Sequence, residues 1–214
     1  MIYYGKELSQ SEAQPMWLFN RKNKQKDDFE MEETFYSESV EVDSDSDEEA
    51  YHQIADIITG HSERIRELLE NYFDNPDLLI EELREDDQSW NDEYAELLEQ
   101  AQDDYWLLML LTLEKEAYAT QIYWRDNAST LASKLPRLKL LKGIALQELQ
   151  TCSVDCLVSE YLECAASKLQ QAGIVLGTIE LDDEHVLIFS ILERRVERLN
   201  NLMNNVEKSW KQIS

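Results

Sequence analysis

The sequence predicts an α+β domain that is mostly helical, with a small antiparallel sheet covered by helices. Two observations lead to this fold class. From Ala50 onward, apolar residues recur at spacings of three and four, the period of amphipathic helices. Three segments, near 118–124, 174–180 and 185–190, are instead rich in strand-forming residues. The last two flank Asp182-Asp183-Glu184 and are predicted to form a hairpin.

Composition divides the chain into a tail, residues 1–49, and a single helix-rich domain, residues 50–214. Between Asp27 and Glu49 there are twelve acidic residues and no basic one. A segment of this composition cannot bury enough apolar surface to order itself. We therefore expect an acidic, flexible tail ahead of the domain.

Four helices are predicted in the first part of the domain. Gly60 ends the first helix, and Ser62 caps the second. Pro76 begins the third, because proline is tolerated in a first helical turn, and Ser89 caps the fourth. The apolar segment 105–113 fits either a helix or a strand, and its structure stays open.

Further helices are predicted after the first strand. Asp126 or Asn127 caps one of them, and apolar residues continue at helical spacing from Leu138 to Leu149. Ser153 opens another helix, which Gly173 ends.

The last helix is predicted to begin at a capping box from Ser190 to Glu193. Its apolar residues alternate at spacings of three and four, which forms a short heptad seam. The seam consists of Val196, Leu199, Met203, Val206 and Trp210. We expect it to pack on the domain's own sheet, and a homodimer through this helix is the alternative.

The charge is strongly negative and unevenly distributed. The chain has 45 acidic and 20 basic residues, a formal net charge of -25. Residues 1–116 hold 33 acidic and 9 basic residues, whereas residues 117–214 hold 12 and 11. Such a chain repels nucleic acid and anionic membranes, so we expect a basic protein as partner, no direct nucleic-acid binding and no stable membrane association.

The sequence predicts a cytoplasmic protein. Residues 1–10 contain no apolar region of a signal peptide, and the longest apolar run, Tyr105 to Leu111, is too short to span a bilayer. The three cysteines, Cys152, Cys156 and Cys164, lie close together. An odd number of clustered thiols fits a reducing compartment better than a disulfide framework.

No catalytic, cofactor or metal site is predicted. The histidines are far apart in sequence, and three cysteines are one ligand short of a structural zinc site. The run Asp43, Asp45, Asp47 fails as a calcium loop, because Glu48 stands where glycine is needed. An enzyme with an unrecognised site remains an alternative.

Aromatic residues set among carboxylates are the candidate partner-binding site. Tyrosine and tryptophan are frequent interface anchors, and a carboxylate rim selects a basic partner. The candidates are Asp86, Asp87, Trp90, Asp92, Glu93, Asp103, Asp104 and Trp106. The alternative is that the rings belong to the core, which we favour for Tyr94 and Tyr105.

Two segments resemble an uncharacterised bacterial family of domains of unknown function. One runs from Gln121 to Asp126, and the other from Ala172 to Leu176 with the Asp182-Asp183 turn and the strand and helix after it. The resemblance covers about the last half of the chain and implies no catalytic residues.

The small acidic chain is also similar in type, without a shared motif, to bacterial immunity proteins. We therefore expect an inhibitory protein that neutralises a basic toxin by occluding its active site. The alternative is an acidic decoy that imitates DNA, which would bind many DNA-binding proteins rather than one partner.

Overall fold

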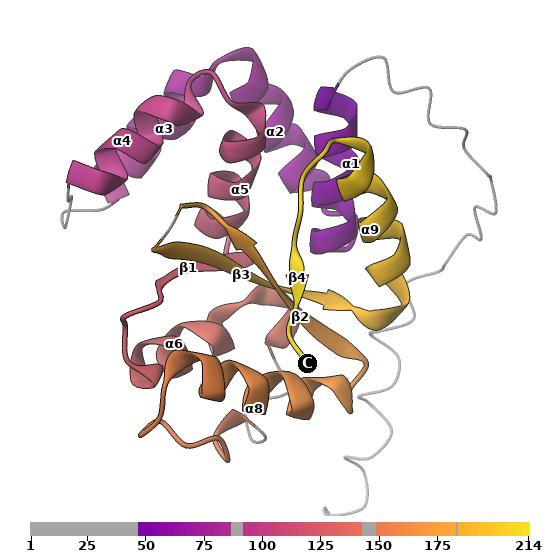
Figure 1. The fold of residues 1–214 in the computed structure, drawn as a ribbon. Helices are drawn as coiled ribbons and strands as arrows, with labels where there is room; N and C mark the ends of the chain where they lie inside the picture. The colour runs from indigo at the N-terminus through magenta and orange to yellow at the C-terminus, as the bar shows by residue number, and fades with distance from the viewer. Residues whose placement is uncertain (1–46, 87–91, 143–148, 183) are drawn as a thin grey trace, which may run out of the picture. The chain divides into compact units, whose positions relative to one another are not determined.

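The domain is built around a four-stranded antiparallel sheet with helices on both faces (Figure 1). The computed structural model describes residues 47–86, 92–142, 149–182 and 184–214, without the side chains of 85–86 and 92–95. The α+β class is therefore confirmed. Most of the predicted tail lies outside the described residues, and residues 47–49 already belong to the first helix.

The sheet has the strand order β1-β3-β2-β4. The strands are β1 (Ala119–Tyr123), β2 (Ile174–Glu180), β3 (His185–Leu192) and β4 (Lys211–Gln212). The predicted hairpin is β2–β3, and β1 pairs with β3 so that Tyr123 lies opposite His185. The fourth strand was not predicted, because two residues are too few to display the period of a strand.

Side-chain alternation divides the core into two layers. Val175 and Phe189 face one cluster of buried residues, whereas Leu176 and Ile188 face the other. Both faces of β2 and β3 are buried, so these strands read as continuous apolar runs.

Within the described ranges, the larger layer contains six helices. They are α1 (Asp47–Thr59), α2 (Glu63–Asp74), α3 (Pro76–Asp86), α4 (Asp92–Ala101), α5 (Tyr105–Lys115) and α9 (Val196–Asn205). The predicted boundaries at Gly60, Ser62 and Pro76 are confirmed. The Ser62 side chain accepts a hydrogen bond from the Ile65 N–H at 3.4 Å, and Gly60 has a positive φ of 79°. The predicted cap Ser89 lies outside the described residues.

The smaller layer contains α6 (Ala128–Lys134) and α8 (Val158–Gln170). Asn127 caps α6 by accepting a hydrogen bond from the Thr130 N–H at 3.0 Å. The prediction of a continuous helix after Leu138 is wrong for the part of this segment that the structure describes. Short 3-10 turns, η1 (Leu135–Arg137) and η2 (Lys139–Leu141), occupy this segment, and residues 143–148 lie outside the described part.

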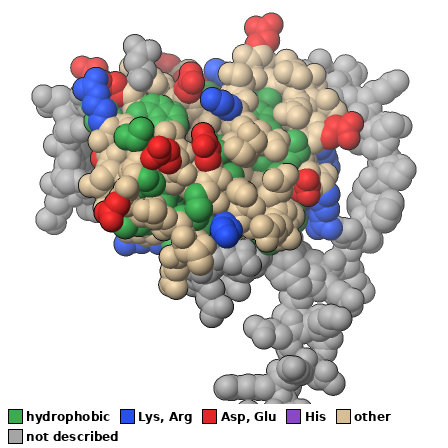
Figure 2. Space-filling model, turned by 60° about the horizontal axis from the view of Figure 1, so that its bottom comes forward, with side chains coloured by type: hydrophobic (Ala, Val, Ile, Leu, Met, Phe, Trp, Pro, Cys, Tyr) green, Lys and Arg blue, Asp and Glu red, His purple; other side chains and the backbone are tan. Residues whose placement is uncertain are grey.

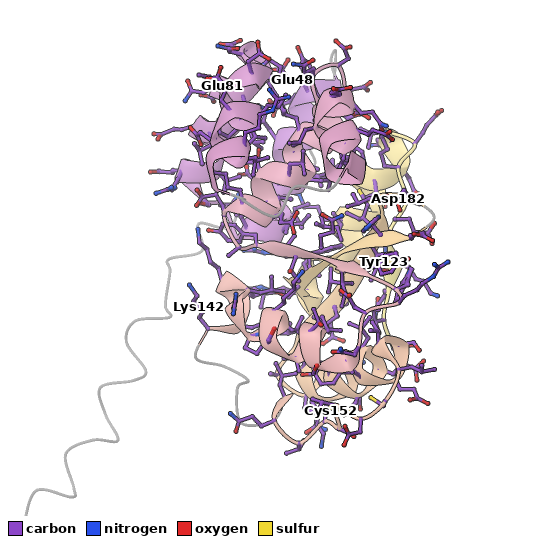
Figure 3. The ribbon with its side chains drawn as sticks, turned by 90° about the vertical axis from the view of Figure 1, so that its left-hand side faces the viewer. Glu48, Glu81, Tyr123, Lys142, Cys152 and Asp182 are labelled. Carbon is purple, nitrogen blue, oxygen red and sulfur yellow. A yellow bond between two sulfur atoms is a disulfide. The ribbon has the colours of Figure 1, made fainter. Side chains whose placement is uncertain are left out.

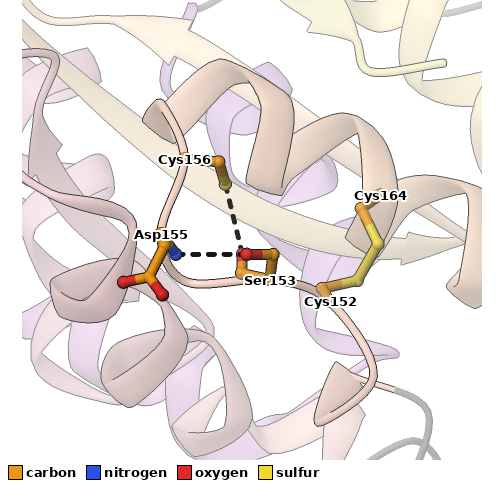
Figure 4. The surroundings of a disulfide bond; sticks show 5 residues. All are labelled: Cys152, Ser153, Asp155, Cys156 and Cys164. Carbon is orange, nitrogen blue, oxygen red and sulfur yellow. Dashed lines mark hydrogen bonds between the residues drawn. A yellow bond between two sulfur atoms is a disulfide. The ribbon is translucent and has the colours of Figure 1, made fainter.

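The start of α8 and the state of its cysteines differ from expectation. The helix begins at Val158 rather than near Ser153, and Leu157 is 68% exposed. Cys152 and Cys164 form a disulfide, while Cys156 keeps a free thiol (Figure 4). The prediction of three thiols is therefore wrong. The segment before α8 folds back along the helix, which cysteine spacing alone does not reveal.

The predicted heptad seam ends earlier than its spacing suggests. Helix α9 stops at Asn205, and Glu207 has a positive φ of 55° that turns the chain back. Trp210 lies beyond the helix and packs against Phe189, with ring centroids 5.5 Å apart. Both rings press on Gly177, where a Cβ atom would meet them at 2.5 to 2.7 Å. The buried part of the seam thus packs on the domain's own core, as expected.

The capping box predicted at Ser190 is also wrong. Ser190 lies within β3 and is buried, and its hydroxyl has no hydrogen-bond partner among the described residues. The chain leaves the strand through a 3-10 turn, η3 (Glu193–Arg195), before α9 begins.

At the free edge of β1, the backbone of Gln121 is covered by the side chains of Glu114 and Lys134. The Glu114 carboxylate accepts a hydrogen bond from the Gln121 N–H at 2.8 Å, and the Lys134 ammonium donates to the Gln121 carbonyl at 2.9 Å. Burial raises the pKa of Glu114, although this hydrogen bond and Lys134 oppose the shift. Covering the backbone groups of an edge strand protects it from pairing with another chain.

Candidate functional site

The helices of the larger layer carry most of the negative charge of the domain. Residues 47–116 contain 22 acidic and 4 basic residues. Ten exposed carboxylates lie on or directly after α2, α3 and α4, and we call them the acidic helical face. They are Glu63, Glu67, Glu70, Asp74, Asp77, Glu81, Glu82, Glu96, Glu99 and Asp103.

The amphipathic pattern explains why these carboxylates point outward. Ile65, Leu69 and Phe73 of α2 are buried in the larger core cluster, which leaves the acidic residues between them in solvent. Figure 3 shows the labelled Glu48 and Glu81 at the end of the domain opposite Cys152. Seen from the side of α6 and α8, charged side chains of both signs are instead scattered among hydrophobic ones (Figure 2).

Few of these carboxylates are engaged within the described residues. Glu82 contacts the Lys115 ammonium and accepts a hydrogen bond from the Tyr72 hydroxyl at 2.9 Å. Asp77 accepts a hydrogen bond from the Gln102 amide at 2.9 Å. Because exposed contacts of this kind contribute little stability, most of the acidic helical face is available to a partner.

The structure separates the predicted candidates around the start of α5. Asp103 is exposed, whereas Asp104 caps α5 by accepting hydrogen bonds from the Trp106 and Leu107 N–H groups at 2.9 and 3.2 Å. Trp106 is only 7% exposed and packs near Tyr51, with ring centroids 5.7 Å apart. Asp104 and Trp106 therefore have structural roles.

Of the two adjacent aromatic residues Tyr105 and Trp106, the exposed one is Tyr105, which we expected in the core. It is 40% exposed and stacks on Phe73, with ring centroids 4.8 Å apart. Asp86 ends α3 and Asp92 and Glu93 begin α4, but their side chains lie outside the described part, as do Asp87 and Trp90 altogether.

A second polar feature, which the sequence did not suggest, lies at the tip of the β2–β3 hairpin. A cavity of about 340 Å³ is lined by Trp124, Glu180, Leu181 and Asp182, and we call it the hairpin pocket. The Trp124 N–H donates to the Glu184 carbonyl at 3.0 Å, which continues the pairing of β1 with β3 by one residue. The pocket thus joins the end of β1 to the hairpin turn.

Asp182 holds the hairpin turn as a carboxylate. It accepts hydrogen bonds from the Glu184 and His185 N–H groups, both at 2.7 Å, and contacts the His185 ring nitrogen Nδ1 at 2.8 Å. Burial alone would raise the pKa of Asp182, but these hydrogen bonds outweigh it and lower the pKa. Figure 3 shows Asp182 and Tyr123 at the same end of the sheet.

Arg125 and His185, the basic residues beside the hairpin pocket, are both engaged by neighbouring carboxylates. The Arg125 guanidinium contacts the Glu184 carboxylate at 2.9 Å and lies 5.7 Å from the centre of the Tyr123 ring. The His185 ring lies 5.3 Å from the Tyr123 ring and is held by Asp182. Neither Arg125 nor His185 is bound to the Glu180 carboxylate, which also lines the pocket.

The described residues contain no group of three or more histidine, cysteine, aspartate or glutamate side chains arranged to hold a metal ion. The three histidines have separate surroundings. His52 is buried against Phe73, and His61 lies 3.7 Å from the Asp56 carboxylate. Across the described ranges, no helix is both long and apolar enough to cross a membrane.

The two segments that carry the family resemblance meet at the hairpin pocket. The first segment, Gln121 to Asp126, contains Trp124, and the second supplies the turn at Asp182. A family model described as a domain of unknown function (DUF6630) matches residues 50–212, which include both segments. No curated protein and no solved structure matches the chain.

Proposed function

The chain belongs to the DUF6630 family, and we propose that it is an inhibitory protein-binding module that occludes the active site of a basic protein. The partner class that suits its charge is a basic bacterial toxin, such as a nuclease. The chain would then act as an immunity protein in the cytosol, without a cofactor.

The acidic helical face is the observation that carries this proposal. Three basic residues, Arg64, Arg66 and Arg84, accompany its ten carboxylates. Arg64 pairs with Glu116 at 2.8 Å, and Arg66 contacts Asp56, so two of the three are engaged inside the domain. A surface of one sign attracts a partner of the opposite sign over long distances and raises the association rate.

The mechanism is steric and electrostatic occlusion. A nuclease binds phosphates through lysine and arginine side chains, and carboxylates presented by α2 to α4 would occupy those side chains in place of the substrate. Tyr105 provides an exposed ring on the same helical layer, where it can act as an aromatic anchor.

Reversing two charges of the acidic helical face should slow association with the partner. Glu96→Lys and Glu99→Lys together are expected to reduce the association rate about tenfold at low salt, because long-range attraction is weakened. The partner is first captured from the native host with the wild-type chain, and stopped-flow mixing then gives the rate. The wild-type rate should itself fall steeply with salt, since screening acts over about 10 Å at 0.1 M.

A matched variant distinguishes the effect of charge on the acidic helical face from the effect of the net charge of the chain. Asp155→Lys and Glu163→Lys change the net charge equally, but these exposed residues lie around α8. This variant should associate almost as fast as wild type. Equal rates for both variants would show that the acidic helical face is only a solvated surface. Capture of many DNA-binding proteins rather than one would identify a decoy instead.

A further inference from the structure

We propose that the hairpin pocket binds a guanidinium group, supplied by free arginine or by an arginine side chain of a peptide. The site is separate from the acidic helical face, and the inference does not depend on the proposed inhibitory function. Three features of the pocket carry it, namely an exposed indole, two carboxylates in the lining and a volume sufficient for a guanidinium head group.

The indole of Trp124 is available to a ligand. Ile122 is buried against the smaller layer, and Trp124 lies two residues further along, on the same side of the sheet. It is 41% exposed, although its backbone is fixed by the Glu184 carbonyl. A cation over an indole face gains about 0.5–1 kcal/mol when exposed and about 2 kcal/mol when desolvated.

Glu180 lies on the same face as Trp124. It is the cross-strand partner of Val186, which is buried in the smaller layer, and cross-strand partners share a face. Glu180 is exposed, and no ion pair engages it among the side chains that the structure describes. Its carboxylate therefore keeps the capacity to bind a cation beside the indole.

Asp182 adds a second carboxylate, which the turn holds at the rim through the Glu184 and His185 N–H groups. The Arg125 guanidinium is bound to Glu184 and so leaves the Glu180 carboxylate unpaired. A planar guanidinium fits this arrangement better than an ammonium, because it stacks on an aromatic face while its edge donates to carboxylates.

The volume of the hairpin pocket is sufficient for a guanidinium head group. The pocket measures about 340 Å³, which lies within the range of about 300–1,000 Å³ found for ligand pockets.

Titration of the full chain with N-acetyl-arginine methylamide tests the proposal. Two-dimensional ¹H–¹⁵N NMR spectra follow the indole N–H of Trp124 and the amides of residues 180–185. We expect saturable shifts confined to these signals. The citrulline counterpart has the same shape without the charge and should give no saturable shift. Free arginine is titrated in parallel, and the tighter of the two arginine ligands identifies the source of the guanidinium.

Variants provide the second half of the test. Glu180→Gln and Trp124→Leu should each weaken binding by roughly tenfold, the equivalent of one lost charge-assisted contact. Glu163→Gln, at an exposed carboxylate of α8, should bind like wild type. The proposal is overturned if arginine gives no saturable shift at low salt, if citrulline binds equally well, or if Glu180→Gln and Trp124→Leu bind like wild type.

Discussion

Leu199→Ala should lower the free energy of unfolding by about 2–5 kcal/mol, the usual cost of truncating a large buried aliphatic side chain. Leu199 is fully buried on the face of α9 that enters the larger core cluster. Helix α9 packs beside α1 and covers the sheet together with it (Figure 1). Removal of the Leu199 side chain leaves a cavity that the neighbouring side chains of the core cannot fill without moving.

Urea denaturation followed by circular dichroism measures the effect. Leu157→Ala is the matched control, because the same atoms are removed from a side chain that is 68% exposed. An exposed substitution of this kind should change stability by no more than about 0.5 kcal/mol. A wild-type midpoint for Leu199→Ala would mean that α9 is peripheral to the fold.

Reduction of the disulfide should destabilise the domain by about 3 kcal/mol, the value expected for a loop of this length. Cys152 and Cys164 are 12 positions apart in the sequence, and the bond holds the segment before α8 against the helix. Opening the bond increases the conformational freedom of the unfolded chain.

Denaturation with and without a reductant gives this difference directly. Cys156→Ser should preserve it, because Cys156 is the free thiol, whereas Cys152→Ala with Cys164→Ala should abolish it. If reduction leaves the denaturation midpoint of the wild-type chain unchanged, the disulfide does not stabilise the domain.

Local patterns in the sequence were sufficient for most of the fold. Three of the four strands were located within about two residues because runs of strand-forming residues end at turn signals. The boundaries at Gly60, Ser62 and Pro76 follow from backbone chemistry that acts over a few residues. The segment 105–113 remained open because α5 is buried on nearly every side and therefore has no polar stripe.

The misplaced features depend on contacts that are distant in the chain. Tyr105 and Trp106 exchanged their expected environments because successive helical residues point about 100° apart, and only the start of α5 at Asp104 fixes which ring faces inward. The disulfide required the fold of the loop before α8. The hairpin pocket required the β1–β3 register, which brings Trp124 beside a turn sixty residues away.

The central claim is that the chain inhibits a basic protein by covering its active site, and the enzymatic activity of the captured partner tests it most directly. Activity is measured while the wild-type chain is added in increasing amounts at low salt. We predict that activity falls to background at one chain per partner, and that the Glu96→Lys, Glu99→Lys variant needs a higher concentration for the same effect. Full activity of a partner that is saturated with the chain would contradict the claim.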